Sequence, residues 1–233
     1  MKIAAFVSLA LLAPLAAGAQ TIKLANPGFE QAPKPGDAIP GWRPHQHAGD
    51  PSYEFALDDK VFAKGKSAFR ITRLLEQDYG ALDQTLPGRD LIGKEIEFSA
   101  LVKTRDVGKR GFVLCINIID AGGDVREQLR SNPRTVGTID TWTRLTARAK
   151  VPSGTRSVEL GFLLIDGGTV WVDEASAKIV TPAAGNAGDK TKAGETTRTS
   201  AKPPYPEKPA KAGKGEKKAR EAATAGDANK NAG

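Results

Sequence analysis

The chain of 233 residues has few of the residues that cross-link or react in proteins. It holds one methionine and a single cysteine, Cys115, and aromatic residues make up 6% of its positions. One cysteine excludes an intramolecular disulfide, so core burial or a bound metal must stabilise the fold. Cys115 lies within GFVLCINIID, residues 111–120, an apolar run where a buried side chain is favoured over a reactive thiolate.

Motifs of common enzyme classes are also missing. The sequence shows no nucleophile elbow, and GKS at 65–67 lacks the upstream glycine of a phosphate-binding loop and precedes an expected strand. His45 and His47 form an H-x-H pair without a signalled third metal ligand, and are expected to be exposed. The acidic residues indicate no glycosidase pair. These absences favour a protein that is not an enzyme.

Residues 1–19 resemble a signal peptide. Lys2 precedes the apolar run IAAFVSLALLAPLA, which is too short to span a bilayer, and AGA at 17–19 offers small residues for cleavage before Gln20. An uncleaved anchor is the alternative, but no second apolar stretch of this kind follows. We therefore expect a secreted or periplasmic protein without a transmembrane segment after cleavage.

Composition changes near residue 181. Residues 182–233 are mainly Ala, Gly, Lys, Pro and Thr, with Tyr205 as the only aromatic, which predicts a disordered tail. The tail has 11 Lys and Arg against 6 Asp and Glu, whereas residues 20–181 have 22 against 21. The tail is a solvated tether or associates weakly with anionic polymers. Specific nucleic-acid binding is not expected, because aromatic residues do not interleave the lysines.

Residues 20–181 show the pattern of one all-β domain. KEIEFSALVKT at 94–104, RLTARAKV at 144–151 and SVELGFLLI at 157–165 alternate apolar and polar residues with the period of strands that bury one face. Turn signals such as LPGRD, AGGD and VPSG separate the expected strands, and no long amphipathic helix is indicated. Many short strands of this kind favour a single jelly-roll β-sandwich.

Seven segments carry a resemblance to a known family. In chain order they are LANPGFEQ at 24–31, IPGW at 39–42, GKSAFRI at 65–71, GALDQTL at 80–86, GKEIEFSALVKT at 93–104, the stretch 136–162 and GGTVWVDEASAKIV at 167–180. Their order and spacing resemble the galactose-binding-like β-sandwich family of carbohydrate-binding modules, which are often appended to xylanases and other polysaccharide hydrolases. The resemblance implies a galactose-binding-domain-like fold and a sugar-binding role.

The resemblance also implies one structural calcium ion. Its side-chain ligands would be Glu30, after NPGF, and Asp173, in VWVDEA, and backbone carbonyls around Lys64 to Lys66 would complete the site. Calcium prefers several hard oxygen ligands, and such an ion would fasten the first strand to the last without a disulfide. The alternative is that both carboxylates accept hydrogen bonds from backbone donors at a strand junction.

A sugar binder needs aromatic side chains for stacking and polar side chains for hydroxyl groups. The domain offers few aromatic candidates. The expected ligand-binding residues are Tyr53, Arg70, Tyr79, Gln84, Asn117 and Gln128. For each of them a surface or paired-core role is an equal alternative, since a buried polar group such as Asn117 must be paired.

Two functions therefore stay open. The first is a secreted, non-catalytic module that binds a glycan or polysaccharide. The second is a structural or protein-interaction β-sandwich of the cell envelope that keeps the fold without sugar binding.

Overall fold

The computed structural model describes residues 19–34 and 39–180. These residues form ten strands and a short 3₁₀ helix, η1 (Gly88–Asp90), and contain no α-helix. The strands are β1 (Gln20–Ile22), β2 (Arg43–Gln46), β3 (Tyr53–Asp58), β4 (Ala68–Arg73), β5 (Gly80–Pro87), β6 (Glu95–Asp120), β7 (Val125–Arg130), β8 (Thr135–Lys150), β9 (Thr155–Leu164) and β10 (Thr169–Val180). The expected all-β fold is confirmed.

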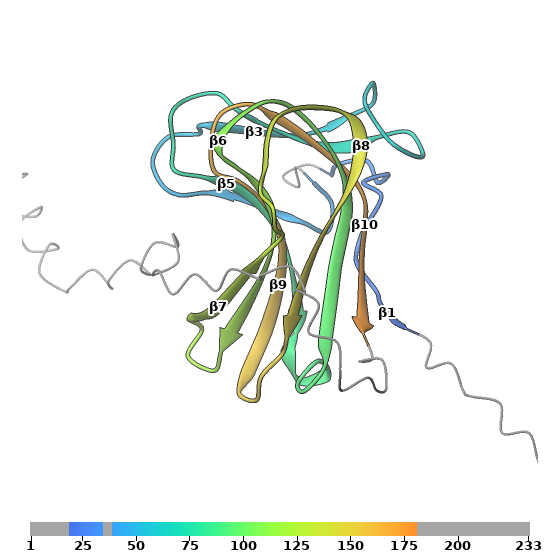
Figure 1. Cartoon of the computed structure of the whole chain (residues 1–233), viewed down its shortest axis with the longest axis vertical. Coiled ribbons are helices and arrows are strands. Elements are labelled where there is room, and N and C mark those ends of the chain that lie inside the picture. Colours follow the sequence, from blue (N-terminus) through green and yellow to red (C-terminus); the bar gives the residue numbers. More distant parts are fainter. Residues whose placement is uncertain (1–18, 35–38, 181–233) are drawn as a thin grey trace, which may run out of the picture. The chain divides into compact units, whose positions relative to one another are not determined.

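Strand β6 organises the body because it takes part in two sheets (Figure 1). Its second half pairs with β7 and β9, and β9 continues to β5 and β2; this is sheet I. Its first half pairs with β8 and β10, and β10 continues to β4, β3 and β1; this is sheet II. All these pairings are antiparallel. The sequence predicts two strands at 94–104 and 111–120, whereas the structure joins them into one strand of 26 residues.

The core lies between the inner faces of the two sheets. The predicted alternation holds in β6, where Ile96, Phe98 and Ala100 are fully buried. Phe162 of β9 lies at the centre, with its ring centroid 5.2 Å from that of Trp42 and 5.4 Å from that of Phe98. Burial of these aromatic side chains together with the many Leu, Ile and Val side chains of the core stabilises a chain that has no intramolecular disulfide.

The segment NPGFE turns the chain into this core. Asn26 and Phe29 have positive φ angles of 42° and 57°, and the Phe29 N–H donates to the Asn26 carbonyl at 3.2 Å. The Asn26 side chain donates to the Pro40 carbonyl and accepts from the Gln31 N–H. Phe29 is fully buried as a result, while Glu30 is exposed on the other side of the chain.

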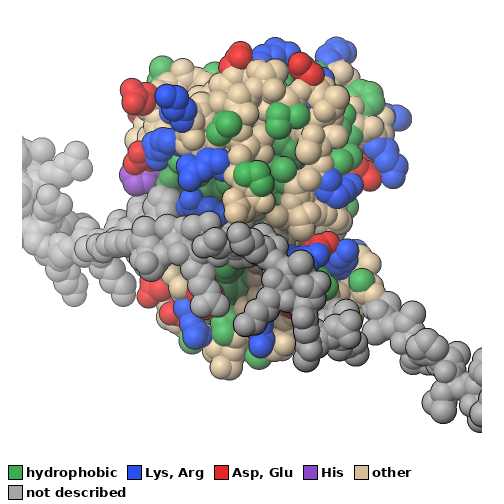
Figure 2. Space-filling view, in the orientation of Figure 1, with side chains coloured by type: hydrophobic (Ala, Val, Ile, Leu, Met, Phe, Trp, Pro, Cys, Tyr) green, Lys and Arg blue, Asp and Glu red, His purple; other side chains and the backbone are tan. Residues whose placement is uncertain are grey.

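The predicted signal peptide, except Ala19, and the predicted tail at 182–233 lie outside the described residues. Within the described ranges, no helix has the length and apolarity needed to cross a membrane. Figure 2 shows Lys and Arg side chains interspersed with Asp and Glu side chains along the margins of the visible face. This mixture agrees with the nearly balanced charge of residues 20–181.

Candidate ligand-binding face

The outer face of sheet I, which we call the polar face, carries polar side chains on neighbouring strands. Thr85 of β5 is the register partner of Glu159 in β9, which is the partner of Asn117 in β6, and Asn117 is the partner of Gln128 in β7. Cross-strand partners point to the same side of a sheet, so these four residues form one row. Along each strand, the residues next to these four point to the opposite, core side of the sheet.

Beside this row the polar face has a small apolar floor. Tyr79, Ala81, Val113, Cys115 and Leu163 form a buried cluster separate from the main core. Burial raises the pKa of the Cys115 thiol, with the Asp83 charge as the next cause. The thiol is therefore protonated and packs as a small apolar group, as the sequence predicts.

Hydrogen bonds fix the polar row. The Gln128 Nε2 donates to Asn117 Oδ1 at 2.8 Å, and Arg130 Nε donates to Gln128 Oε1 at 2.8 Å. Arg43 forms an ion pair with Glu159 at 3.4 Å. Burial lowers the pKa of the Arg130 guanidinium from its usual value. Asn117 is fully buried and orients Gln128, so Thr85, Glu159 and Gln128 are the members of the row that present donors and acceptors in fixed positions.

Two histidines join this face, although the sequence analysis expected them to be exposed. His45 Nε2 lies 2.6 Å from Asp83 Oδ2, and both histidine rings contact the ring of Tyr79 edge-on. Burial and the charges of Asp83 and Asp78 raise the pKa of Tyr79 to about 12. The H-x-H spacing was the available signal, because two residues two positions apart in an extended segment point to the same side; His45 lies in β2 and His47 directly follows it.

Of the six expected ligand residues, the structure brings Tyr79, Asn117 and Gln128 to the polar face. Tyr53 belongs to the main core, and its hydroxyl donates to the Gln77 and Leu164 carbonyls, each at 3.4 Å. Burial raises its pKa to about 12. These contacts make Tyr53 a packing residue.

Arg70 and Gln84 also lie elsewhere. Arg70 is on the outer face of sheet II, where it forms ion pairs with Glu54 at 2.8 Å and Asp58 at 3.5 Å. Gln84 points to the core side of β5, between Leu82 and Leu86. Its amide binds backbone groups before β2, so these two side chains stabilise the scaffold.

The four expected metal-site positions do come together. The Asp173 Oδ2 accepts hydrogen bonds from the N–H groups of Ala63, at 2.8 Å, and Lys64, at 3.0 Å. The Glu30 carboxylate accepts from the Lys66 N–H, at 3.0 Å to each oxygen. One loop therefore fastens the N-terminal segment to β10, and we call Glu30, Asp173 and residues 63–67 the carboxylate latch.

The groups around the two latch carboxylates can be compared with the ligands that a calcium ion needs. The loop turns N–H groups toward both carboxylates, whereas the predicted site requires carbonyls. A Cβ on Gly65, whose φ is +78°, would lie 2.1 Å from Glu30 Oε1, so the carboxylate rests against the loop backbone. The described residues contain no group of three or more His, Cys, Asp or Glu side chains suited to a metal. Hydrogen bonds satisfy both carboxylates, and calcium stays a prediction.

Comparisons with known proteins place this geometry among β-sandwiches. No protein-family model matches the chain, and no curated protein matches its sequence. The tandem of two CBM22 modules from Paenibacillus barcinonensis Xyn10C aligns with 76% of this chain and 50% of its own, at 16% identity and a TM-score of 0.51. The fold is that of a galactose-binding-like β-sandwich. The resemblance seen in the sequence is confirmed at the level of the fold.

Two further structures share this fold. The enzymatically active domain of bacteriophage CBA120 tailspike protein 4 has a TM-score of 0.51 at 14% identity, over 67% of this chain and 21% of its own. The arabinose-bound α-L-arabinofuranosidase MgGH51 has a TM-score of 0.50 at 11% identity, over 70% of this chain and 27% of its own. The chain thus spans between a fifth and a half of the length of these three proteins.

Proposed function

We propose that this protein is a non-catalytic glycan-binding module whose polar face binds an extended polysaccharide chain. The row formed by Thr85, Glu159, Asn117 and Gln128 carries the proposal. Amide, carboxylate and hydroxyl groups are the partners that sugar hydroxyls require, and the row crosses four strands spaced about 4.8 Å apart. A ligand that follows the row would be an oligosaccharide rather than a single sugar.

The proposal extends to the ends of the chain. We propose that residues 1–19 direct export and that the module acts in the periplasm or outside the cell. The basic tail would then provide weak attraction to anionic polymers, screened by salt. The CBM22 modules that share the fold support the glycan class of ligand.

Binding has a direct test. We expect the Gln128→Ala substitution to weaken binding of xylohexaose about tenfold, because one positioned hydrogen-bond partner of the row is lost. Isothermal titration calorimetry measures the dissociation constant. Glu127→Ala, at the adjacent position of β7 with the opposite orientation, is the matched control and leaves binding unchanged. Absence of saturable binding to soluble oligosaccharides would instead favour a structural or protein-interaction sandwich.

The calcium prediction is tested separately. An ion that binds only the folded state stabilises it by about 2.7 kcal/mol at a hundred times its dissociation constant. Chelation with EDTA is then expected to lower the melting temperature by about 5 to 11 °C, with recovery on adding calcium. Magnesium is the control cation. An unchanged melting temperature in EDTA would leave the hydrogen bonds of the carboxylate latch as the only link.

A further inference from the structure

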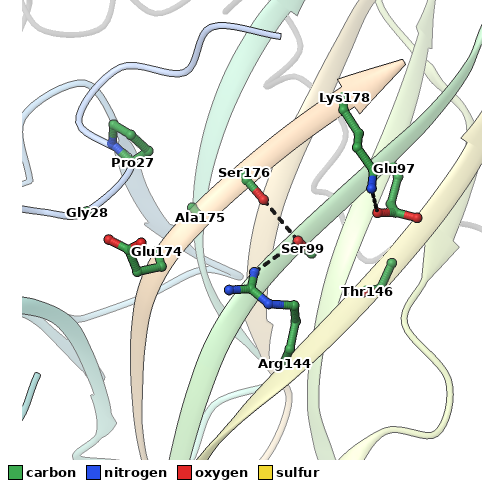
Figure 3. Close-up of a pocket in the computed structure, with 10 residues that line it drawn as sticks. All are labelled: Pro27, Gly28, Glu97, Ser99, Arg144, Thr146, Glu174, Ala175, Ser176 and Lys178. Carbon is green, nitrogen blue, oxygen red and sulfur yellow. Dashed lines mark hydrogen bonds and ion pairs between the residues drawn. The ribbon is translucent and has the colours of Figure 1, made fainter. Parts of the chain in front are cut away.

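A polar groove lies on the outer face of sheet II, away from the polar face on sheet I. It has a volume of about 470 Å³, and its centre is formed by Ser99 of β6, Arg144 and Thr146 of β8, and Ser176 of β10. We call it the arginine groove. Figure 3 shows Arg144 reaching from β8 across β6, with Glu174 on the far side of the groove. No residue of the polar face lines it.

Arg144 is the residue that requires an explanation. Its Nη1 donates to the Ser99 hydroxyl at 3.2 Å, and among the described residues no carboxylate lies within ion-pair distance of its guanidinium. The Ser99 hydroxyl is in turn 3.0 Å from the Ser176 hydroxyl, and Ser99 is buried. The guanidinium is thus oriented by a hydroxyl network while its other N–H groups face the groove.

The acidic side chains at the groove are already neutralised. Glu97 accepts from Lys178 at 2.8 Å and from Arg148 at 2.5 Å. Burial acts to raise the pKa of Glu97, but these hydrogen bonds outweigh it and lower the pKa, so the side chain is ionised and paired. Glu174 pairs with Lys64 at 3.4 Å. The charge of Arg144 therefore remains available to a ligand.

We infer that the arginine groove binds the carboxylate of an acidic sugar, a hexuronate residue within a glycan. The planar guanidinium matches a carboxylate through two parallel hydrogen bonds, and the exposed Thr146 and Ser176 hydroxyls suit the hydroxyl groups of the same ring. The inference rests on the proposed function for the class of ligand but uses a different face. Without an aromatic side chain in the lining, charge and hydrogen bonds dominate binding, which weakens as salt rises.

The test uses the full chain with trigalacturonate as the acidic probe and xylohexaose as the neutral probe. Arg144→Gln is expected to weaken trigalacturonate binding roughly tenfold and to leave xylohexaose binding unchanged. Arg144→Lys keeps the positive charge but loses the planar guanidinium, so its affinity for trigalacturonate is expected to lie between those of the wild type and Arg144→Gln. Lys150→Gln, on the same face of β8 but outside the lining, removes one positive charge without touching the groove, is the matched control and retains wild-type affinity for both probes.

Amide shifts in NMR spectra locate each probe independently of the variants. Trigalacturonate is expected to shift the amides of Ser99, Thr146 and Ser176, and xylohexaose those of Asn117 and Gln128. The inference is overturned if the wild-type chain does not bind trigalacturonate, if Arg144→Gln binds it normally, or if its shifts map to the polar face. Loss of xylohexaose binding alone contradicts the proposed function and leaves the arginine groove intact.

Discussion

Gln84→Leu is expected to lower the free energy of unfolding by about 3 kcal/mol. The Gln84 amide accepts from the Ala25 N–H at 2.8 Å and donates to the Ala25 and Gly41 carbonyls at 3.1 and 2.9 Å. Leucine has a similar size but leaves these three backbone groups without their partner, and Gln84 is only 8% exposed, so water replaces the bonds poorly. Urea unfolding followed by tryptophan fluorescence measures the change.

The control for this prediction is Thr85→Ala at the next position of β5. Thr85 is exposed, so the free energy of unfolding of the Thr85→Ala variant should stay within about 0.5 kcal/mol of the wild-type value. A Gln84→Leu protein with wild-type stability would show that the segments around Ala25 and Gly41 are held by their packing alone.

Asp173→Ala is expected to lower the free energy of unfolding by a similar amount, about 3 kcal/mol, because it removes the Asp173 hydrogen bonds of the carboxylate latch. The Asp173 carboxylate accepts from the N–H groups of Ala63, Lys64 and Glu174 and is fully buried. Burial raises the pKa of Asp173, and the three hydrogen bonds act against that rise. Removal of the carboxylate leaves the three donors unpaired, and the melting temperature should fall by about 6 to 12 °C.

Asp173→Asn separates the hydrogen bonds from the charge. Its remaining side-chain oxygen can still accept from the loop, so we expect a loss of only about 1 kcal/mol in EDTA. Equal losses for the alanine and asparagine variants would show that the negative charge, and not the acceptor geometry, holds the loop. The measurement is thermal unfolding followed by circular dichroism, with EDTA present for every variant so that calcium does not contribute.

Local patterns predicted much of the fold. The alternation in residues 94–104 and 157–165 identified strands whose inward residues, such as Phe98 and Phe162, are buried. The resemblance of NPGFE and VWVDEA to a known family placed Glu30 and Asp173 near the same loop, and the hydrogen bonds of the carboxylate latch confirm that proximity. The chemical role of the loop was harder to predict, because the sequence does not reveal whether a backbone turns its carbonyls or its N–H groups toward a side chain.

The candidate site was predicted less completely. Gln84 was expected to bind a ligand, but it shares a side of β5 with Leu82 and Leu86, and that side is the core, where its amide anchors the segments at Ala25 and Gly41. His45 was assigned to an exposed loop, and only the pairing of β2 with β5 brings it to Asp83. The alternation at 144–151 gives Arg144 the same outward direction as Arg148 and Lys150 and carries no sign that it lacks an acidic partner.

The sequence by itself determined that the domain is built from strands and, in strands such as 95–104 and 157–164, which side chains point inward, because the period of two in a strand is a local property. The tertiary structure decided which polar side chains meet. Glu159 joins the row of Asn117 and Gln128, and Ser99, Arg144 and Ser176 share a groove, only because strands distant in the chain pair in one register. A shift of one residue would turn each of these side chains to the other face.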